Sequence, residues 1–191
     1  MIQIFLNPHL EFNMYKKIIS LSLFLSFLPL VAFSAEDPSR IRLYVPASVS
    51  ASVEGCDTCT VGGSGYAAHY VFGFGLGLGV SNSKLTITPP VGDAIWADTG
   101  MMTDISYTFG SEFTFTLGYG MGSSNTNSQA ESNSEYWTAG GATNSLIGFG
   151  YDFGGFEALL AMRIVTSKMT YYTLPVESSW NSTEIGVGFT F

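Results

Sequence analysis

His69 is the residue in this chain best suited to acid–base chemistry, and it is the only histidine after residue 35. A histidine beside a serine and an acidic residue is the arrangement that nucleophilic hydrolases use. Serines are abundant here, so a Ser–His pairing stays open. We place His69 near the end of its strand that lies away from the short turns, facing inward, beside Glu54. A lone inward histidine more often forms hydrogen bonds in a packed interior, so we expect no catalytic residue.

Two cysteines have the spacing of a redox motif, Cys56-Asp57-Thr58-Cys59. A thioredoxin-like site requires a strand that leads into a helix, and no helical pattern follows. In an oxidising compartment, two loop cysteines more often form a small structural disulfide. We therefore predict a disulfide between Cys56 and Cys59, with free or intermolecularly paired thiols as the alternative.

Carboxylates gather in the predicted loops, where Lys168 is the accompanying cation. Such loops can hold divalent cations that bridge to lipopolysaccharide, but a solvated acidic surface is the ordinary interpretation. We expect no metal site and no cofactor. The loop carboxylates are Glu54, Asp57, Asp93, Asp98, Glu131, Glu135 and Glu177.

Six ionisable residues fall on the polar face of segments whose other face is apolar. We predict that Arg163 pairs with Glu184, because both lie seven residues from the same rim of the sheet. Asp104 is placed to reach Arg163 from the opposite wall, and Arg42 to meet Glu157 or Asp152. Separate solvation of each group by internal water is the alternative. The six residues are Arg42, His69, Asp104, Glu157, Arg163 and Glu184.

The segments that carry these residues alternate with period two, which is the periodicity of β-strands. The first runs over 40–54, where Pro46 predicts a bulge. The second runs from about Tyr66 to Gly79 and is followed by a turn at Ser81-Asn82-Ser83. Further strands cover 84–88, 101–109, 113–121, 147–151, 156–164 and 184–191. The total is eight strands.

The connections alternate between tight turns and long loops. Tight turns are predicted at Gly110-Ser111 and Phe153-Gly155, and long polar loops at Gly122–Gly141 and Ser167–Trp180. Aromatic residues are expected in two girdles, one beside the short turns and one beside the long loops. Their members are Phe109, Phe113, Phe153, Phe156 and Phe191 in the first girdle, and Trp96, Trp137, Tyr172 and Trp180 in the second.

The composition is that of a chain whose strands face an apolar environment. Of 191 residues, 46% are hydrophobic and only 12% are charged, against roughly 25% charged in soluble proteins. No run after residue 35 approaches the roughly 20 apolar residues of a membrane helix. Interleaved apolar residues are typical of membrane strands instead. The net charge of −8 argues against a nucleic-acid partner.

The amino-terminal segment has the features of a signal peptide. Lys16 and Lys17 precede an apolar run over 18–33, and small residues favour cleavage after Ser34 or Ala35. We expect 1–13 to be a misannotated leader, 14–35 the signal peptide and 36–191 a single barrel domain.

The last eight residues resemble the terminal strand by which bacterial outer-membrane β-barrels are recognised for insertion. Glu184, Gly186, Phe189 and Phe191 fill the fixed polar, glycine, hydrophobic and aromatic positions of that pattern. The region 36–191 resembles the small eight-stranded outer-membrane barrel superfamily, which includes the barrel of outer-membrane protein A. The resemblance implies an all-β, single antiparallel up-and-down transmembrane barrel with short periplasmic turns and long extracellular loops.

The resemblance also implies a function and partners. We expect a monomeric integral outer-membrane protein with a structural or surface-interaction role. Its expected partners are outer-membrane lipid, lipopolysaccharide, and, during biogenesis, the barrel-assembly machinery and periplasmic chaperones. Inward glycines make a narrow uptake channel for small, mostly apolar solutes the alternative, unless larger side chains fill the space. A lipid-modifying enzyme that uses His69 is a third interpretation.

Overall fold

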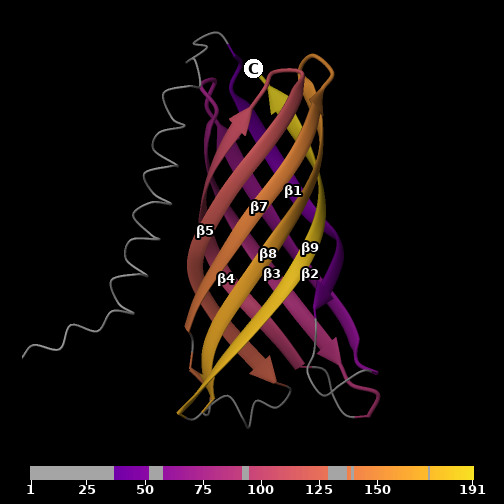
Figure 1. Cartoon of the computed structure of the whole chain (residues 1–191), viewed down its shortest axis with the longest axis vertical. Helices are drawn as coiled ribbons and strands as arrows, with labels where there is room; N and C mark the ends of the chain where they lie inside the picture. Colours follow the sequence, from indigo (N-terminus) through magenta and orange to yellow (C-terminus); the bar gives the residue numbers. More distant parts are fainter. Residues whose placement is uncertain (1–36, 52–57, 92–94, 129–136, 139, 172) are drawn as a thin grey trace, which may run out of the picture. The chain divides into compact units, whose positions relative to one another are not determined.

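A computed structural model describes residues 37–51, 58–91, 95–128, 137–138, 140–171 and 173–191. In these ranges the chain forms eight long strands and one strand of two residues (Figure 1). Within them, no helix is long and apolar enough to cross a membrane. The strands are β1 (Arg40–Ala51), β2 (Thr60–Val71), β3 (Leu76–Thr88), β4 (Ile95–Phe109), β5 (Phe113–Ser128), β6 (Trp137–Thr138), β7 (Gly140–Asp152), β8 (Phe156–Tyr171) and β9 (Leu174–Thr190).

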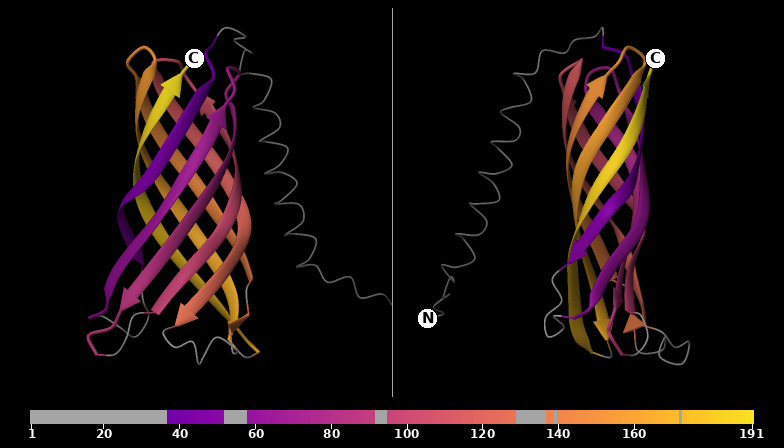
Figure 2. Two further views of the ribbon diagram at one scale, coloured as in Figure 1. Left: turned by 180° about the vertical axis from the view of Figure 1, so that it is seen from behind. Right: turned by 90° about the vertical axis from the view of Figure 1, so that its right-hand side faces the viewer.

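The long strands form one antiparallel sheet that closes on itself. Each long strand pairs with the next one along the chain, and β9 pairs with both β8 and β1. The short β6 adds two residue pairs to the end of β8. Figure 2 shows the closed wall of strands from two further sides. The predicted pairing of the first strand with the terminal strand is therefore confirmed, and the barrel has no open edge at this seam.

Three tight turns and the carboxyl terminus share one rim, which we call the short-turn rim (Figure 1). The turns lie at 72–75, 110–112 and 153–155. Gly75, Gly110 and Gly154 have φ angles of 93°, 85° and 85°, a left-handed conformation that glycine adopts without steric cost. At the end of the chain, the Phe191 backbone N–H donates to the Ser39 carbonyl at 3.0 Å. We call the opposite end the far rim.

The prediction for the second and third strands was wrong. The turn lies at 72–75, and Ser81, Asn82 and Ser83 lie inside β3. Aromatic and aliphatic residues alternate without interruption from Tyr70 to Leu78, so the alternation hides the turn. The three polar residues resemble a turn by composition, but Ser81 and Ser83 are buried in the interior of the barrel.

The strands also extend further toward the far rim than predicted. β8 runs to Tyr171 and β9 begins at Leu174, so most of the predicted loop Ser167–Trp180 is a paired hairpin. β5 continues to Ser128 and β7 begins at Gly140, which shortens the predicted loop Gly122–Gly141. Serine, threonine and asparagine in these segments indicated loops, yet they lie within paired strands.

The predicted bulge in the first strand is confirmed and has a consequence for the faces of β1. The register between β1 and β9 shifts between Pro46 and Ser48. An extra residue inverts the alternation that follows it. Val49 and Ala51 therefore pack against the interior, whereas strict alternation placed them on the same outer face as Val45, which is 51% exposed.

The outer wall of the barrel is apolar from the short-turn rim to about half its height, and we call this surface the apolar belt. Val45, Tyr66, Ile164 and Ile185 are its last members toward the far rim on their strands, and polar side chains follow them. An apolar outer band around a closed barrel is the surface of a transmembrane β-barrel. The belt comprises the outward Ile, Leu, Val, Met, Tyr and Phe side chains of all eight long strands.

Candidate functional site

All six ionisable residues predicted to face the interior are buried there. Each is at most 4% exposed, although together they come from five strands. They form two clusters at different heights, separated by a layer of apolar side chains. The predicted inward orientation of Arg42, His69, Asp104, Glu157, Arg163 and Glu184 is thus what the structure shows.

The cluster nearer the short-turn rim is built around Arg42 of β1 and Glu157 of β8. The guanidinium donates Nε–H and Nη2–H to the two carboxylate oxygens at 2.7 and 2.6 Å. Its other donors reach the hydroxyls of Thr108, Thr116 and Thr114 at 2.9, 2.7 and 3.2 Å. All five guanidinium N–H groups therefore have partners. Of the two predicted partners of Arg42, the structure selects Glu157; Asp152 lies 4.0 Å from Arg40 instead.

The central cluster is built around Arg163 of β8, which bonds to side chains of three other strands, β9, β4 and β7. Its Nε donates to Glu184 Oε1 at 2.8 Å, and its Nη1 lies 3.0 Å from Asp104 Oδ2. Both predicted contacts of Arg163 are confirmed. Arg163 lies opposite Ser182, not Glu184, in the ladder, so the ion pair runs diagonally between β8 and β9. His69 Nε2 lies 2.9 Å from the same Asp104 oxygen.

Two further members of the central cluster were not predicted. Asn144 donates to Asp104 Oδ1 at 2.9 Å and accepts from Arg163 Nη1 at 3.0 Å. Ser81 donates to Asp104 Oδ1 at 3.0 Å. Asn144 alternates in phase with the inward Leu146, which was the available signal. Ser81 was hidden by its assignment to a turn.

Apolar side chains fill the layers between and above the charged clusters. Tyr44, Ala67, Leu146, Leu159 and Ala161 separate the two clusters. Trp180, Met102 and Leu85 fill the interior toward the far rim, each at most 2% exposed. The prediction that Trp180 belongs to an outer aromatic girdle was wrong. Trp180 lies in β9, and its indole N–H donates to Ser83 Oγ at 2.9 Å inside the barrel.

Several inward glycines make room for large side chains of neighbouring strands. A Cβ atom at Gly79 would lie 2.1 Å from the His69 ring, and one at Gly120 would lie 2.0 Å from Asp104. At Gly150 it would lie 2.4 Å from Thr114 and 2.6 Å from Glu157. The space above these glycines is thus occupied. Large side chains therefore fill the space beside these glycines in the described strands.

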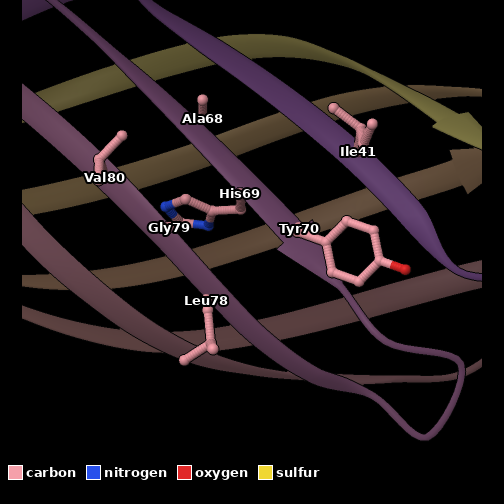
Figure 3. A pocket seen from close by; sticks show the side chains of 7 residues that line it. All are labelled: Ile41, Ala68, His69, Tyr70, Leu78, Gly79 and Val80. Atoms are coloured by element: carbon pink, nitrogen blue, oxygen red, sulfur yellow. The ribbon is translucent and has the colours of Figure 1, made fainter.

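His69 lies deeper and nearer the short-turn rim than predicted, because β2 ends at Val71. Its predicted neighbour Glu54 lies outside the described residues. Figure 3 shows His69 with the residues around a depression of about 450 Å³ on the wall of the barrel. The outward side chains of Ile41, Tyr70 and Leu78 line this depression. It therefore belongs to the apolar belt.

The remaining predicted residues lie at the two rims. Phe109, Phe113, Phe153, Phe156 and Phe191 are exposed near the short-turn rim, as predicted for a girdle. Neighbouring rings touch around this rim: the centroids of Phe156 and Phe189 are 6.0 Å apart, and those of Tyr70 and Phe191 are 6.2 Å apart. Of the four residues predicted to form the insertion signal, Phe189 and Phe191 point outward, Glu184 points inward, and Gly186 lies opposite Tyr44 of β1.

Most residues predicted near the far rim lie outside what the structure describes. Cys59 is disulfide-bonded, and its predicted partner Cys56 is outside the described residues, as are Tyr172 and the predicted signal peptide over 14–35. Lys168 lies 3.4 Å from Glu177 on the exposed end of the β8–β9 hairpin. The loop carboxylates Glu54, Asp57, Asp93, Glu131 and Glu135 are also outside the described residues.

Comparisons with known proteins identify the fold. No protein-family model and no curated protein matches the chain. The solved structure of Neisserial surface protein A is similar, with a TM-score of 0.58 and 13% identity over 80% of this chain and 96% of that chain. Weaker matches, both with a TM-score of 0.44, are the N-terminal β-barrel domain of Pseudomonas aeruginosa OprF (15% identity, 81% of this chain, 98% of that chain) and Ail, the attachment invasion locus protein of Yersinia pestis (14%, 81%, 99%). Together with the apolar belt, the likeness to Neisserial surface protein A confirms the predicted fold: the chain is a small eight-stranded antiparallel barrel of the outer-membrane type.

Proposed function

We propose that this chain is an integral outer-membrane protein with a structural or surface-contact role, and that solutes do not pass through its barrel. The observation that carries the proposal is the packed interior. Two charged clusters and two apolar layers occupy it, and Arg42, Arg163 and Trp180 are each at most 1% exposed. The similar structure of Neisserial surface protein A is described as that of a surface protein, which agrees with a role outside the barrel.

The competing function is a narrow uptake channel, and electrical recording separates the two. We expect the folded protein in planar bilayers to show no steady conductance, because the guanidinium of Arg42 bonds to β8, β4 and β5 across the interior. A porin recorded under the same conditions sets the detection limit. Discrete conductance steps that are present with folded protein and absent after heat denaturation would contradict the proposal.

The geometry of the central cluster does not favour the enzymatic interpretation. In nucleophilic catalysis, the hydroxyl of a serine hydrogen-bonds to the base that activates it. Ser81 Oγ donates to Asp104, not to His69. All three side chains lie in the interior, each at most 3% exposed, where a lipid substrate has no access. A His69→Ala variant should therefore leave the lipid composition of the outer membrane unchanged.

The orientation of the barrel is the second testable part of the proposal. We expect the short-turn rim to face the periplasm and the far rim to face the outside. A cysteine at Lys168, where the side chain is 68% exposed, should react with a membrane-impermeant maleimide on intact cells. A cysteine at Ser111, in a short turn, should react only after lysis. Wild-type protein, in which Cys59 is already disulfide-bonded, gives the background labelling. Labelling of Ser111→Cys on intact cells would show that the barrel has the opposite orientation.

A further inference from the structure

The terminal strand β9 closes the barrel, and two successive inward positions near its carboxyl-terminal end are glycines. β9 lies between β1 and β8. Its inward positions there are Gly186 and Gly188. Each glycine faces one inward residue on either side: Arg42 and Glu157 flank Gly188, and Tyr44 and Leu159 flank Gly186.

The flanking side chains meet each other over the glycines. Above Gly188, Arg42 and Glu157 form the two hydrogen bonds of 2.7 and 2.6 Å. Above Gly186, Tyr44 and Leu159 belong to one apolar cluster. A Cβ atom on Gly188 would lie 2.6 Å from Glu157 Oε2 and 2.9 Å from Glu157 Cβ, closer than real Cβ atoms approach. β1 and β8 are thus joined across the strand that separates them.

We propose that Arg42 and Glu157 form a closure clasp, a buried ion pair that locks the terminal strand into the seam, with Gly188 as the positioning residue that admits it. When β9 is absent from the seam, β1 and β8 are the two edges of an open sheet. Inserting β9 brings these edges to the distance at which Arg42 and Glu157 bond. For β9 to leave, both of its ladders and the clasp must break, and the two charges must separate in a confined interior.

The clasp accounts for the placement of the neighbouring polar groups. Three threonines of β4 and β5 bond to the ion pair from the opposite side of the barrel. Thr108 and Thr116 accept hydrogen bonds from Arg42, and Thr114 donates one to Glu157. They satisfy the donors that Glu157 leaves free, so the guanidinium is anchored to β4, β5 and β8 at once. Burial of a charge is tolerated only with such complete partnering. The threonine hydroxyls therefore hold Arg42 in position above Gly188.

The first test compares two single substitutions of inward glycines. Gly188→Ala should reduce the folded fraction after refolding into detergent micelles, and the protein that does fold should unfold at least about tenfold faster in denaturant. Gly148→Ala is the matched control, because a Cβ there would lie 3.5 Å from its nearest neighbour, Ala161 Cβ. The heat-modifiable mobility of the barrel in electrophoresis measures the folded fraction. Equal effects of the two substitutions would overturn the clasp.

A second test removes the clasp, and it remains informative if Gly188→Ala does not fold. In an Arg42→Met/Glu157→Ala background, a Cβ at Gly188 no longer meets a carboxylate, and only its contact of 2.9 Å with the Cβ atom of residue 157 remains. The additional loss caused by Gly188→Ala should therefore be smaller in this background than in the wild-type protein. If Gly188→Ala remains as harmful without the clasp, the glycine serves another purpose and the proposal is wrong.

Hydrogen exchange distinguishes a lock on the seam from general stabilisation. In the Arg42→Met/Glu157→Ala protein, amide exchange in β9 and β1 should accelerate more than exchange in the central part of β5. A lock predicts this difference, because local opening of one seam exposes only the amides beside it. Uniform acceleration around the barrel would assign the ion pair to general stability and reject the clasp.

Discussion

Replacing Arg163 by alanine should lower the free energy of unfolding of the barrel by about 3–5 kcal/mol, the cost of breaking a buried ion pair from one side. The reason is that the substitution strands two carboxylates. Glu184 loses its 2.8 Å bond and Asp104 its 3.0 Å bond, while both remain in an interior where they are at most 4% exposed. Urea unfolding in detergent micelles, followed by electrophoretic mobility, measures the change.

A second substitution tests whether the stranded charge is the cause. Arg163→Ala/Glu184→Gln should be less destabilised than Arg163→Ala, because one of the two unpaired charges is removed. Asp104 keeps its bonds to His69, Asn144 and Ser81 in both proteins. Lys168→Ala is the surface control: its pair with Glu177 is 68% and 60% exposed, and such pairs contribute about 1 kcal/mol or less. A double variant as unstable as the single one would contradict the explanation.

Trp180→Ala should cost a similar amount, about 3–5 kcal/mol, for a different reason. The indole is 1% exposed and packs with Leu85, Met102, Ala142 and Val165, so its removal leaves a cavity. It also leaves the hydroxyl of Ser83 without the 2.9 Å bond from the indole N–H. Denaturant unfolding of the purified barrel measures the loss.

Trp180→Phe separates the two contributions to that loss. Phenylalanine keeps most of the ring volume and removes the hydrogen bond, so we expect a loss of about 1–2 kcal/mol, close to that of one buried hydrogen bond. If Trp180→Ala were as stable as the wild type, Trp180 would have to lie in the outer girdle, where truncation removes only contacts with lipid.

The sequence by itself determined the architecture, because period two separates two environments along every strand. Apolar residues such as Ile41 and Phe189 alternate with polar or small ones, and a low charge content assigns the apolar face to lipid. With an apolar outer face, backbone groups are satisfied only if the sheet closes, so pairing of β1 with β9 followed. The same alternation placed Arg163, Glu184 and Asp104 inside, where unpaired charges are costly, and thereby predicted their contacts.

Only the tertiary structure decided where strands turn, because turn composition and strand composition overlap. Ser81-Asn82-Ser83 has the composition of a turn, but its serines face polar partners inside the barrel. The true turn at 72–75 depends on the φ angle of Gly75, which an alternating pattern cannot reveal. The strand extensions toward the far rim were missed for the same reason: hydroxyl side chains suit a loop and the polar outer wall of a strand equally well.

The filling of the interior was also a property of the fold and not of any one segment. The number of inward glycines suggested space, but several of them lie beside a large residue on a neighbouring strand, as Gly79 does beside His69 and Gly188 beside Glu157. These neighbours depend on the register of the ladders and on the bulge at Pro46, which turns Val49 and Ala51 inward. A residue's volume can be read from the sequence, whereas the volume opposite it is set by strand pairing, so only the closed barrel shows that the interior is packed.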